Sequence, residues 1–215
     1  IVVLLSWYDE SPEMLAETVA SWAALADGVV ALDGAYADYP DGRGESPREQ
    51  GDAILEAAGT AGMWVEVVTR STDGVWAGNE VEKRTRLFQL GEARTRGDDW
   101  YLIADADEGL ECAVPSLVRL RLERLMGSWR AVAVTVEHDT PMPQPRLVRA
   151  IRGLRVEVRH DRYVTPDGRL LWGTPHHDDV EPWADLTSVV SLRHHPGRPP
   201  ERRAAQKAYS DIVPR

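Results

Sequence analysis

Long apolar runs, cysteines and lysines are scarce in this sequence. No stretch of about 18 consecutive apolar residues is present, which argues against a membrane-spanning helix. Cys112 is the only cysteine, so no intramolecular disulfide can form, and the lone thiol fits a reducing compartment. Lys83 and Lys207 are the only lysines among 25 basic residues. We therefore expect a soluble, cytoplasmic protein whose positive charges are almost all arginines.

Acidic residues outnumber basic ones. The 215 residues include 35 Asp and Glu against 25 Lys and Arg, and the formal net charge is -10. Such an excess would repel the phosphates of a nucleic acid, which argues against bulk electrostatic binding but not against a local nucleotide site. The length suits one domain with a hydrophobic core better than two. We therefore predict a single acidic domain.

The first half of the chain alternates between strand and helix patterns. Its short, continuously apolar runs are typical of strands covered on both faces, and the amphipathic segments between them are typical of helices. Ser11 followed by Pro12 has the form of a helix N-terminus, and 46–49 has the spacing of a capping box. This alternation predicts an α/β fold with a Rossmann-like, mostly parallel sheet flanked by helices. The predicted strands are 1–5, 29–32, 63–69 and 100–103, and the predicted helices begin at Pro12, Ser46 and Asn79.

The alternation is lost in the second half. A helix from Pro115 to about Met126 is followed by a strand at 131–136 and a proline-rich turn at 141–145. Further strand-like segments come next, and a last helix reaches Tyr209. These patterns predict a smaller α+β part.

Carboxylates follow three separate predicted strands. Asp9 and Glu10 follow the first, Asp33 the second, and Asp105 and Asp107 the fourth. The carboxyl ends of parallel strands meet at one edge of a sheet, where ligands bind. Clustered carboxylates favour a hard divalent cation such as Mg²⁺ or Mn²⁺, which also takes oxygen ligands from a nucleotide diphosphate. The alternative is that these acids only cap loops and helices, as single Asp residues commonly do.

Three motifs resemble, in order, those of glycosyltransferases with the GT-A fold, in particular family 2. They are 2–10 (VVLLSWYDE), 30–34 (VALDG) and 103–107 (IADAD), the last matching the family's DxD motif. The resemblance covers most of the chain and implies a nucleotide-sugar-binding half at 1–110 and an acceptor-binding half at 111–215. It implies that Asp33 accepts a hydrogen bond from the base, that Asp105 lies near the donor ribose and that Asp107 meets the metal. The other donor contacts it implies, in the loop after the first strand, are Ser6, Tyr8 and Glu10.

The segment 76–84 (WAGNEVEKR) resembles the helix that precedes the DxD strand in that family and lines the donor pocket. Lys83 or Arg84 could then direct a cation at the diphosphate and stabilise the leaving group. The alternative is a solvated helix face, on which Glu80 and Arg84 form an ordinary ion pair four residues apart.

The segment 172–179 (WGTPHHDD) resembles the Gly-x-x-His-Glu segment of many family 2 members, with Asp in place of Glu. The acid of this segment is the candidate catalytic base, which takes the proton of the acceptor hydroxyl. Asp178 is the first candidate and Asp179 the second. The two His and two Asp could equally form a metal cluster or a loop network of hydrogen bonds.

The segment 190–197 (VSLRHHPG) resembles the family's late strand, which ends in a His that often completes the metal shell. Either His194 or His195 could take this place. An imidazole ligand would favour Mn²⁺ over Mg²⁺.

The function that this resemblance implies is a metal-dependent glycosyltransferase with a UDP- or GDP-linked sugar as donor and an inverting single displacement. The acceptor stays open among a glycan, a protein and a nucleic acid base. One rival is a nucleotidyltransferase that makes nucleotide sugars, but its usual glycine-rich loop after the first strand is missing from 6–11. The other rival is a non-catalytic module of the same fold that binds a sugar or a nucleotide.

Overall fold

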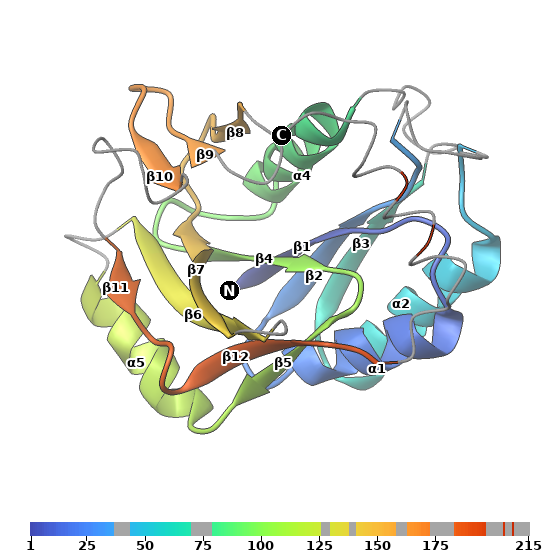
Figure 1. Cartoon of the computed structure of the whole chain (residues 1–215), viewed down its shortest axis with the longest axis horizontal. Coiled ribbons are helices and arrows are strands. Elements are labelled where there is room, and N and C mark those ends of the chain that lie inside the picture. Colours follow the sequence, from blue (N-terminus) through green and yellow to red (C-terminus); the bar gives the residue numbers. More distant parts are fainter. Residues whose placement is uncertain are drawn as a thin grey trace.

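The computed structural model describes residues 1–36, 44–69, 79–125, 130–137, 141–157, 163–172 and 183–196, together with Ala204 and Ala208. These residues form a large curled sheet, a small second sheet and the helices that cover them (Figure 1). The fold is a mixed α/β fold, as the alternating pattern of the first half predicts.

The large sheet is parallel on one side and mixed on the other. Along it the strands follow the order β3-β2-β1-β4-β7-β6-β12-β5, and β11 pairs with β6. The strands β3, β2, β1 and β4 run parallel, whereas β7 is antiparallel to both β4 and β6, and β5 is antiparallel to β12. The prediction of a mostly parallel sheet therefore holds for the first four strands, and the rest mixes directions. The bounds are β1 Val2–Ser6, β2 Gly28–Leu32, β3 Trp64–Val68, β4 Trp100–Asp105, β5 Glu108–Cys112, β6 Ala131–Glu137, β7 Met142–Arg149, β11 Ala184–Asp185 and β12 Val190–His194.

Helices cover both faces of this sheet, which is why its first strands are continuously apolar. In Figure 1, α1 (Pro12–Trp22), α2 (Arg48–Thr60) and α5 (Pro115–Leu125) lie below the sheet, and α4 (Glu80–Glu92) lies above it. Each face has its own hydrophobic core, one with Leu15 and Ile54, the other with Leu87 and Phe88. The small antiparallel sheet packs beside α4, and its strands are β8 Arg155–Val156, β9 Tyr163–Val164 and β10 Leu170–Trp172.

Two helix starts were predicted from side-chain caps, and one of the predictions is wrong. Ser11 caps α1 as expected, since its Oγ accepts a hydrogen bond from the backbone N–H of Met14 at 3.2 Å. The capping box at Ser46 does not form, because α2 has Pro47 at its N-cap without a side-chain hydrogen bond. The Ser46 hydroxyl instead donates a hydrogen bond to the carboxylate of Asp33, which directly follows β2.

The proline-rich turn predicted at 141–145 is also wrong, since these residues enter β7. Pro143 lies opposite Thr135 of β6. The pairing of β7 with β4 covers only 147–149, so Pro143 and Pro145, the two prolines within β7, lie where β7 has β6 alone beside it among the described residues. A strand tolerates proline where the missing N–H leaves no neighbour unpaired.

Strand β5 was not predicted. It follows β4 after a turn of two residues and forms the end of the strand order, next to β12. Its outer side is covered by α1: Ser21 Oγ accepts from Leu110 N–H at 2.8 Å, and Trp22 Nε1 donates to the Glu108 carbonyl at 2.9 Å. These side chains satisfy backbone groups that an exposed edge strand would present to other chains.

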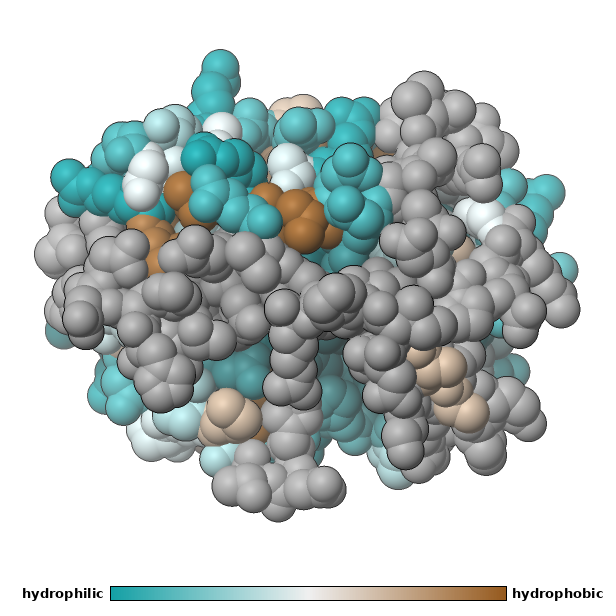
Figure 2. Space-filling view, turned by 45° about the horizontal axis from the view of Figure 1, so that its top comes forward, coloured by the Kyte–Doolittle hydropathy of each residue, from teal (hydrophilic) through white to brown (hydrophobic). Residues whose placement is uncertain are grey.

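The described surface in Figure 2 is mainly hydrophilic, with only small hydrophobic patches. None of the helices in the described part of the chain has the length and apolarity that crossing a membrane requires. The helix predicted to reach Tyr209 falls almost entirely outside the described residues, of which Ala204 and Ala208 are helical.

Two helical glycines provide a matched test of the packing of α4. A Cβ at Gly91 would lie 2.8 Å from Cε1 of the fully buried Tyr101, whereas a Cβ at Gly59 in α2 would meet nothing within 4 Å. We expect Gly91→Ala to lower the free energy of unfolding by about 1–3 kcal/mol through overpacking. Gly59→Ala should raise it by about 0.4–1 kcal/mol. Urea unfolding of both variants checks this, and equal effects would contradict the close packing of α4 on β4.

Candidate functional site

The predicted site residues come from strand ends that the sheet brings to one edge. Ser6 at the end of β1 lies opposite Leu32 of β2 on one side and Asp105 of β4 on the other. On the far side of the β4–β5 turn, His194 of β12 lies opposite Glu108 of β5. The parallel strands and the β5–β12 pair therefore bring carboxylates and an imidazole from distant parts of the chain together.

The β4–β5 turn, residues 105–108, is called the acidic turn below. Its last member, Glu108, is fully buried. Glu108 Oε2 accepts from the backbone N–H of Asp105 at 2.8 Å, and Oε1 accepts from Arg146 NH2 at 2.7 Å. Burial raises the pKa of Glu108, Arg146 opposes the rise, and the nearby Asp105 adds to it.

Asp105 lies between two arginines. Arg84 NH2 donates to Asp105 Oδ1 at 2.9 Å, and Arg146 NH2 is 3.9 Å from Oδ2. Arg84 also bonds Glu80 through its Nε at 3.0 Å. Burial alone would lower the pKa of Arg84, but Asp105 and Glu80 raise it well above its usual range. Glu80, Arg84, Asp105, Arg146 and Glu108 thus form one chain of alternating charges, called the charge chain below.

Among the described residues of the charge chain and the acidic turn, carboxylates outnumber guanidinium groups. The charge chain contains three carboxylates and two arginines, and Asp107, which is also buried, adds a fourth carboxylate. When all are ionised the net charge is about −2, the charge that one divalent cation neutralises. Within the described residues, no group of three or more His, Cys, Asp or Glu could hold a metal ion by itself. A cation here would therefore need oxygen ligands from a substrate.

The two histidines have different surroundings. His194 Nδ1 is 3.0 Å from the Glu137 carbonyl, and its Nε2 is 3.8 Å from Glu108 Oε1. A hydrogen bond from Nδ1–H to the carbonyl leaves the Nε2 lone pair on the side of the acidic turn, the arrangement that a metal-binding His needs. The His195 ring lies against α1, with Nε2 2.7 Å from Glu17 Oε2, and its backbone N–H donates to the Asp107 carbonyl. Of the two predicted ligands, His194 is therefore the better placed.

Asp33 is buried and held by Ser46. Its Oδ2 accepts from the Ser46 backbone N–H at 2.8 Å and its Oδ1 from the Ser46 hydroxyl. Burial raises the pKa of Asp33, and the hydrogen bonds from Ser46 oppose the rise. A cavity of about 490 Å³ adjoins it, lined also by Trp7, Arg48 and Thr69. The predicted base-binding residue thus lies beside a cavity large enough for a nucleoside.

Lys83 does not lie on a solvated helix face. Its Nζ donates to the carbonyls of Trp7 at 2.7 Å and Gly34 at 2.6 Å, and so ties the loops after β1 and β2 to α4. Burial lowers the pKa of Lys83 to about 7, although Asp33 raises it. The Glu80–Arg84 pair predicted as the alternative exists, but it is buried. The solvated-face interpretation is therefore wrong, and a contact of either cation with a diphosphate stays a prediction.

The loop after β1 is pinned from two sides. Ser6 is hydrogen-bonded to Tyr36, and the backbone N–H of Glu10 donates to Gln50 of α2 at 3.1 Å. Asp9 has a positive φ of 50°, a conformation that Asp tolerates, and its N–H donates to Ser46 Oγ. Ser6, Tyr8 and Glu10, the predicted donor contacts of this loop, are all buried.

Two predicted site residues fall outside the described residues, and two residues of the site were not predicted. Asp178 and Asp179, the candidate bases, belong to 173–182, which the structure does not describe. Glu108 and Arg146 were not predicted as site residues. The position of Glu108 directly after the DxD motif was a usable signal. Arg146 had none, because the sequence does not show that the segment after the predicted turn at 141–145 lies beside β4.

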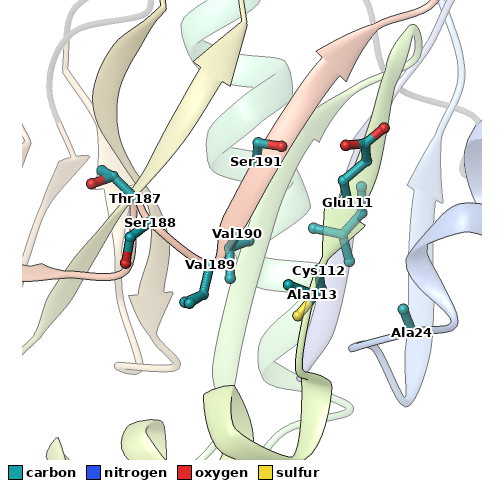
Figure 3. Close-up of a pocket in the computed structure, with 10 residues that line it drawn as sticks. Ala24, Glu111, Cys112, Ala113, Thr187, Ser188, Val189, Val190 and Ser191 are labelled. Atoms are coloured by element: carbon teal, nitrogen blue, oxygen red, sulfur yellow. The ribbon is translucent and has the colours of Figure 1, made fainter.

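A second cavity of about 500 Å³ lies at the other end of β5 and β12 (Figure 3). Cys112 and Ala113 line one side, and 187–191 line the other. Among the described residues that line it, Glu111 is the only charged one, so these residues offer no cation for a phosphate. It suits a nucleotide less well than the cavity beside Asp33.

No protein-family model matches this chain, and no curated protein matches it. The site must therefore be interpreted from its own geometry.

The buried Lys83 predicts a specific pH dependence of stability. Its pKa is lower in the folded protein, about 7, than its usual value, so between pH 7 and 10 the unfolded chain binds more protons and stability rises with pH. In Lys83→Met this contribution disappears. As the pH rises, we expect the unfolding free energy of the wild type to increase relative to that of Lys83→Met by about 1 kcal/mol per pH unit.

Denaturant unfolding between pH 7 and 9.5 measures this difference. Leu87→Ala is the control, because it removes a buried side chain from the same helix and keeps the lysine. If the difference stayed constant with pH, the buried lysine would have an ordinary pKa.

Proposed function

We propose that this chain is a metal-dependent glycosyltransferase of the GT-A type that transfers a sugar from a nucleotide-diphosphate donor. The observation that carries the proposal is the gathering of carboxylates in the acidic turn beside His194, at the carboxyl edge of the parallel strands. Open α/β sheets bind their ligands at this edge.

The residues at the acidic turn fit a divalent cation that is shared with a diphosphate. Asp105 is paired with Arg84, and the residues that would hold the cation are Asp107 in the acidic turn and His194 beside it. Mg²⁺ and Mn²⁺ are commonly bound by one or two carboxylates and completed by substrate phosphates. The imidazole favours Mn²⁺. Bound there, the cation would neutralise charge on the departing diphosphate.

The donor would extend from the acidic turn toward α2. The base would enter the cavity beside Asp33, and the ribose would lie near Asp105, between the two strand ends. Lys83 and Ser46 hold the surrounding loops in place, so the pocket is organised before the donor binds. Preorganised loops reduce the entropy lost on binding. Donors linked to UDP or GDP are the ones we propose.

The reaction we propose is a single displacement with inversion. The acceptor hydroxyl would attack the anomeric carbon while a carboxylate, Asp178 or Asp179, takes its proton. The hydrogen bond from Arg84 would keep Asp105 oriented during this step. The acceptor is a glycan, a protein or a nucleic acid base, and the compartment we propose is the cytoplasm, in keeping with the single cysteine.

Thermal unfolding with nucleoside diphosphates tests the donor site. At 100 times its Kd, a ligand that binds only the native state stabilises it by about 2.7 kcal/mol. We expect UDP or GDP with Mn²⁺ to raise the melting temperature, chelator to abolish the rise, and Asp107→Asn to remove it. Asp98→Asn is the matched control, because this aspartate is exposed and precedes the start of β4, at the opposite end of that strand from Asp105.

The outcome separates the proposed function from its rivals. A rise that is the same with chelator and in Asp107→Asn would favour a nucleotide-binding module without metal chemistry. No rise with any nucleoside diphosphate would refute the donor site.

A further inference from the structure

Glu108 has no counterpart among the predicted donor or metal contacts, yet it is the most enclosed acid of the site. Its side chain is fully buried, and both oxygens already accept hydrogen bonds, from Asp105 N–H and from Arg146. Its own carbonyl accepts from Trp22 Nε1 on α1. A buried carboxylate needs such compensation to remain charged.

The hydrogen bond to Asp105 closes the acidic turn. It joins the carboxylate of Glu108 to the backbone three residues earlier, so Ala106 and Asp107 lie within a closed loop. On the other side the backbone N–H of His195 donates to the Asp107 carbonyl at 2.6 Å. Two hydrogen bonds therefore fix the backbone around Asp107. One is accepted by the Glu108 carboxylate, and the other is donated by the backbone of His195, the residue after β12.

We propose that Glu108 is a positioning residue, with Arg146 as its charge partner, that holds the acidic turn so that Asp107 and His194 meet the same divalent cation. The proposal rests on the proposed function, since it concerns the geometry of that metal site. Glu108 acts through the turn and is not itself a ligand, because both of its oxygens are already used by N–H donors.

The isosteric variant Glu108→Gln tests this directly. The carboxylate serves two donors with two oxygens, whereas an amide has one oxygen and turns an NH₂ group toward the second donor. One of the two hydrogen bonds must therefore break. We expect the variant to bind MnCl₂ together with UDP or GDP about tenfold more weakly than the wild type, as when an outer-shell partner of a metal ligand is lost.

A second substitution should restore binding. In Glu108→Gln combined with Arg146→Met, the donor that competes for the single amide oxygen is gone, so Gln at 108 can accept from Asp105 N–H again. Replacing both members of a buried ion pair is also better tolerated than replacing one. We expect the double variant to recover to within about threefold of wild-type affinity, whereas loss of a direct metal ligand could not be rescued in this way.

The matched control is Glu111→Gln on the same strand, whose partner Arg193 forms an exposed ion pair with it at 2.8 Å. Affinity for MnCl₂ with UDP or GDP is measured by calorimetry, and the melting temperature is measured without ligand. A role in stability alone would lower the melting temperature of Glu108→Gln and leave its affinity unchanged.

Each result has one meaning. Weaker binding in Glu108→Gln with recovery in the double variant supports the proposal. Unchanged affinity in Glu108→Gln, or a folded double variant that does not bind, overturns it and leaves the proposed function standing; the double variant alone decides if the single one does not fold. Absence of Mn²⁺-dependent binding in the wild type itself would overturn the proposed function and this inference together.

Discussion

The charge chain from Glu80 to Glu108 adds buried ion pairs between elements that also meet through apolar packing and strand pairing. It passes from α4 to the end of β4, to β7 and back to the start of β5, and its arginines are buried. Removing one member of such a pair strands a buried charge, which costs about 3–5 kcal/mol. The relative positions of α4, β4 and β7 therefore depend on this chain, and so does the orientation of Asp105.

The same charge chain gives the two aspartates of the DxD motif different surroundings. Asp105 is paired with Arg84, whereas the backbone of Asp107 is hydrogen-bonded to His195, next to His194. Around this centre the loops are fixed by few contacts: Lys83 joins two strand ends, and Ser46 joins Asp33 to the loop after β1. Each contact uses a polar side chain, Lys83 in α4 or Ser46 just before α2, to hold a loop at the sheet edge, which is how a rigid scaffold positions a binding site.

Local patterns predicted most of the first half, because burial on both faces and Ser11 capping leave direct marks in the sequence. They also predicted that carboxylates collect at one edge. The predictions that were wrong have one physical cause: the structure of these residues depends on partners that are distant in the sequence. Ser46 has the spacing of a capping box but donates a hydrogen bond to Asp33. The prolines of β7 are tolerated because of how the neighbouring strands pair with it. Arg146 becomes part of the site only through the pairing of β7 with β4. The pair of candidate bases, Asp178 and Asp179, stays a prediction.

The strand order has a consequence for the order of assembly. β5 leaves the acidic turn immediately after β4, but its only strand partner in the described residues is β12, which is made much later. Pairing across such a sequence separation closes a long loop and is slow to form. During synthesis, the parallel strands β1 to β4 can therefore assemble first, with β5 lying against α1 through Ser21 and Trp22. The imidazole arrives only when β12 docks, so competence to hold a metal would mark the last stage of folding.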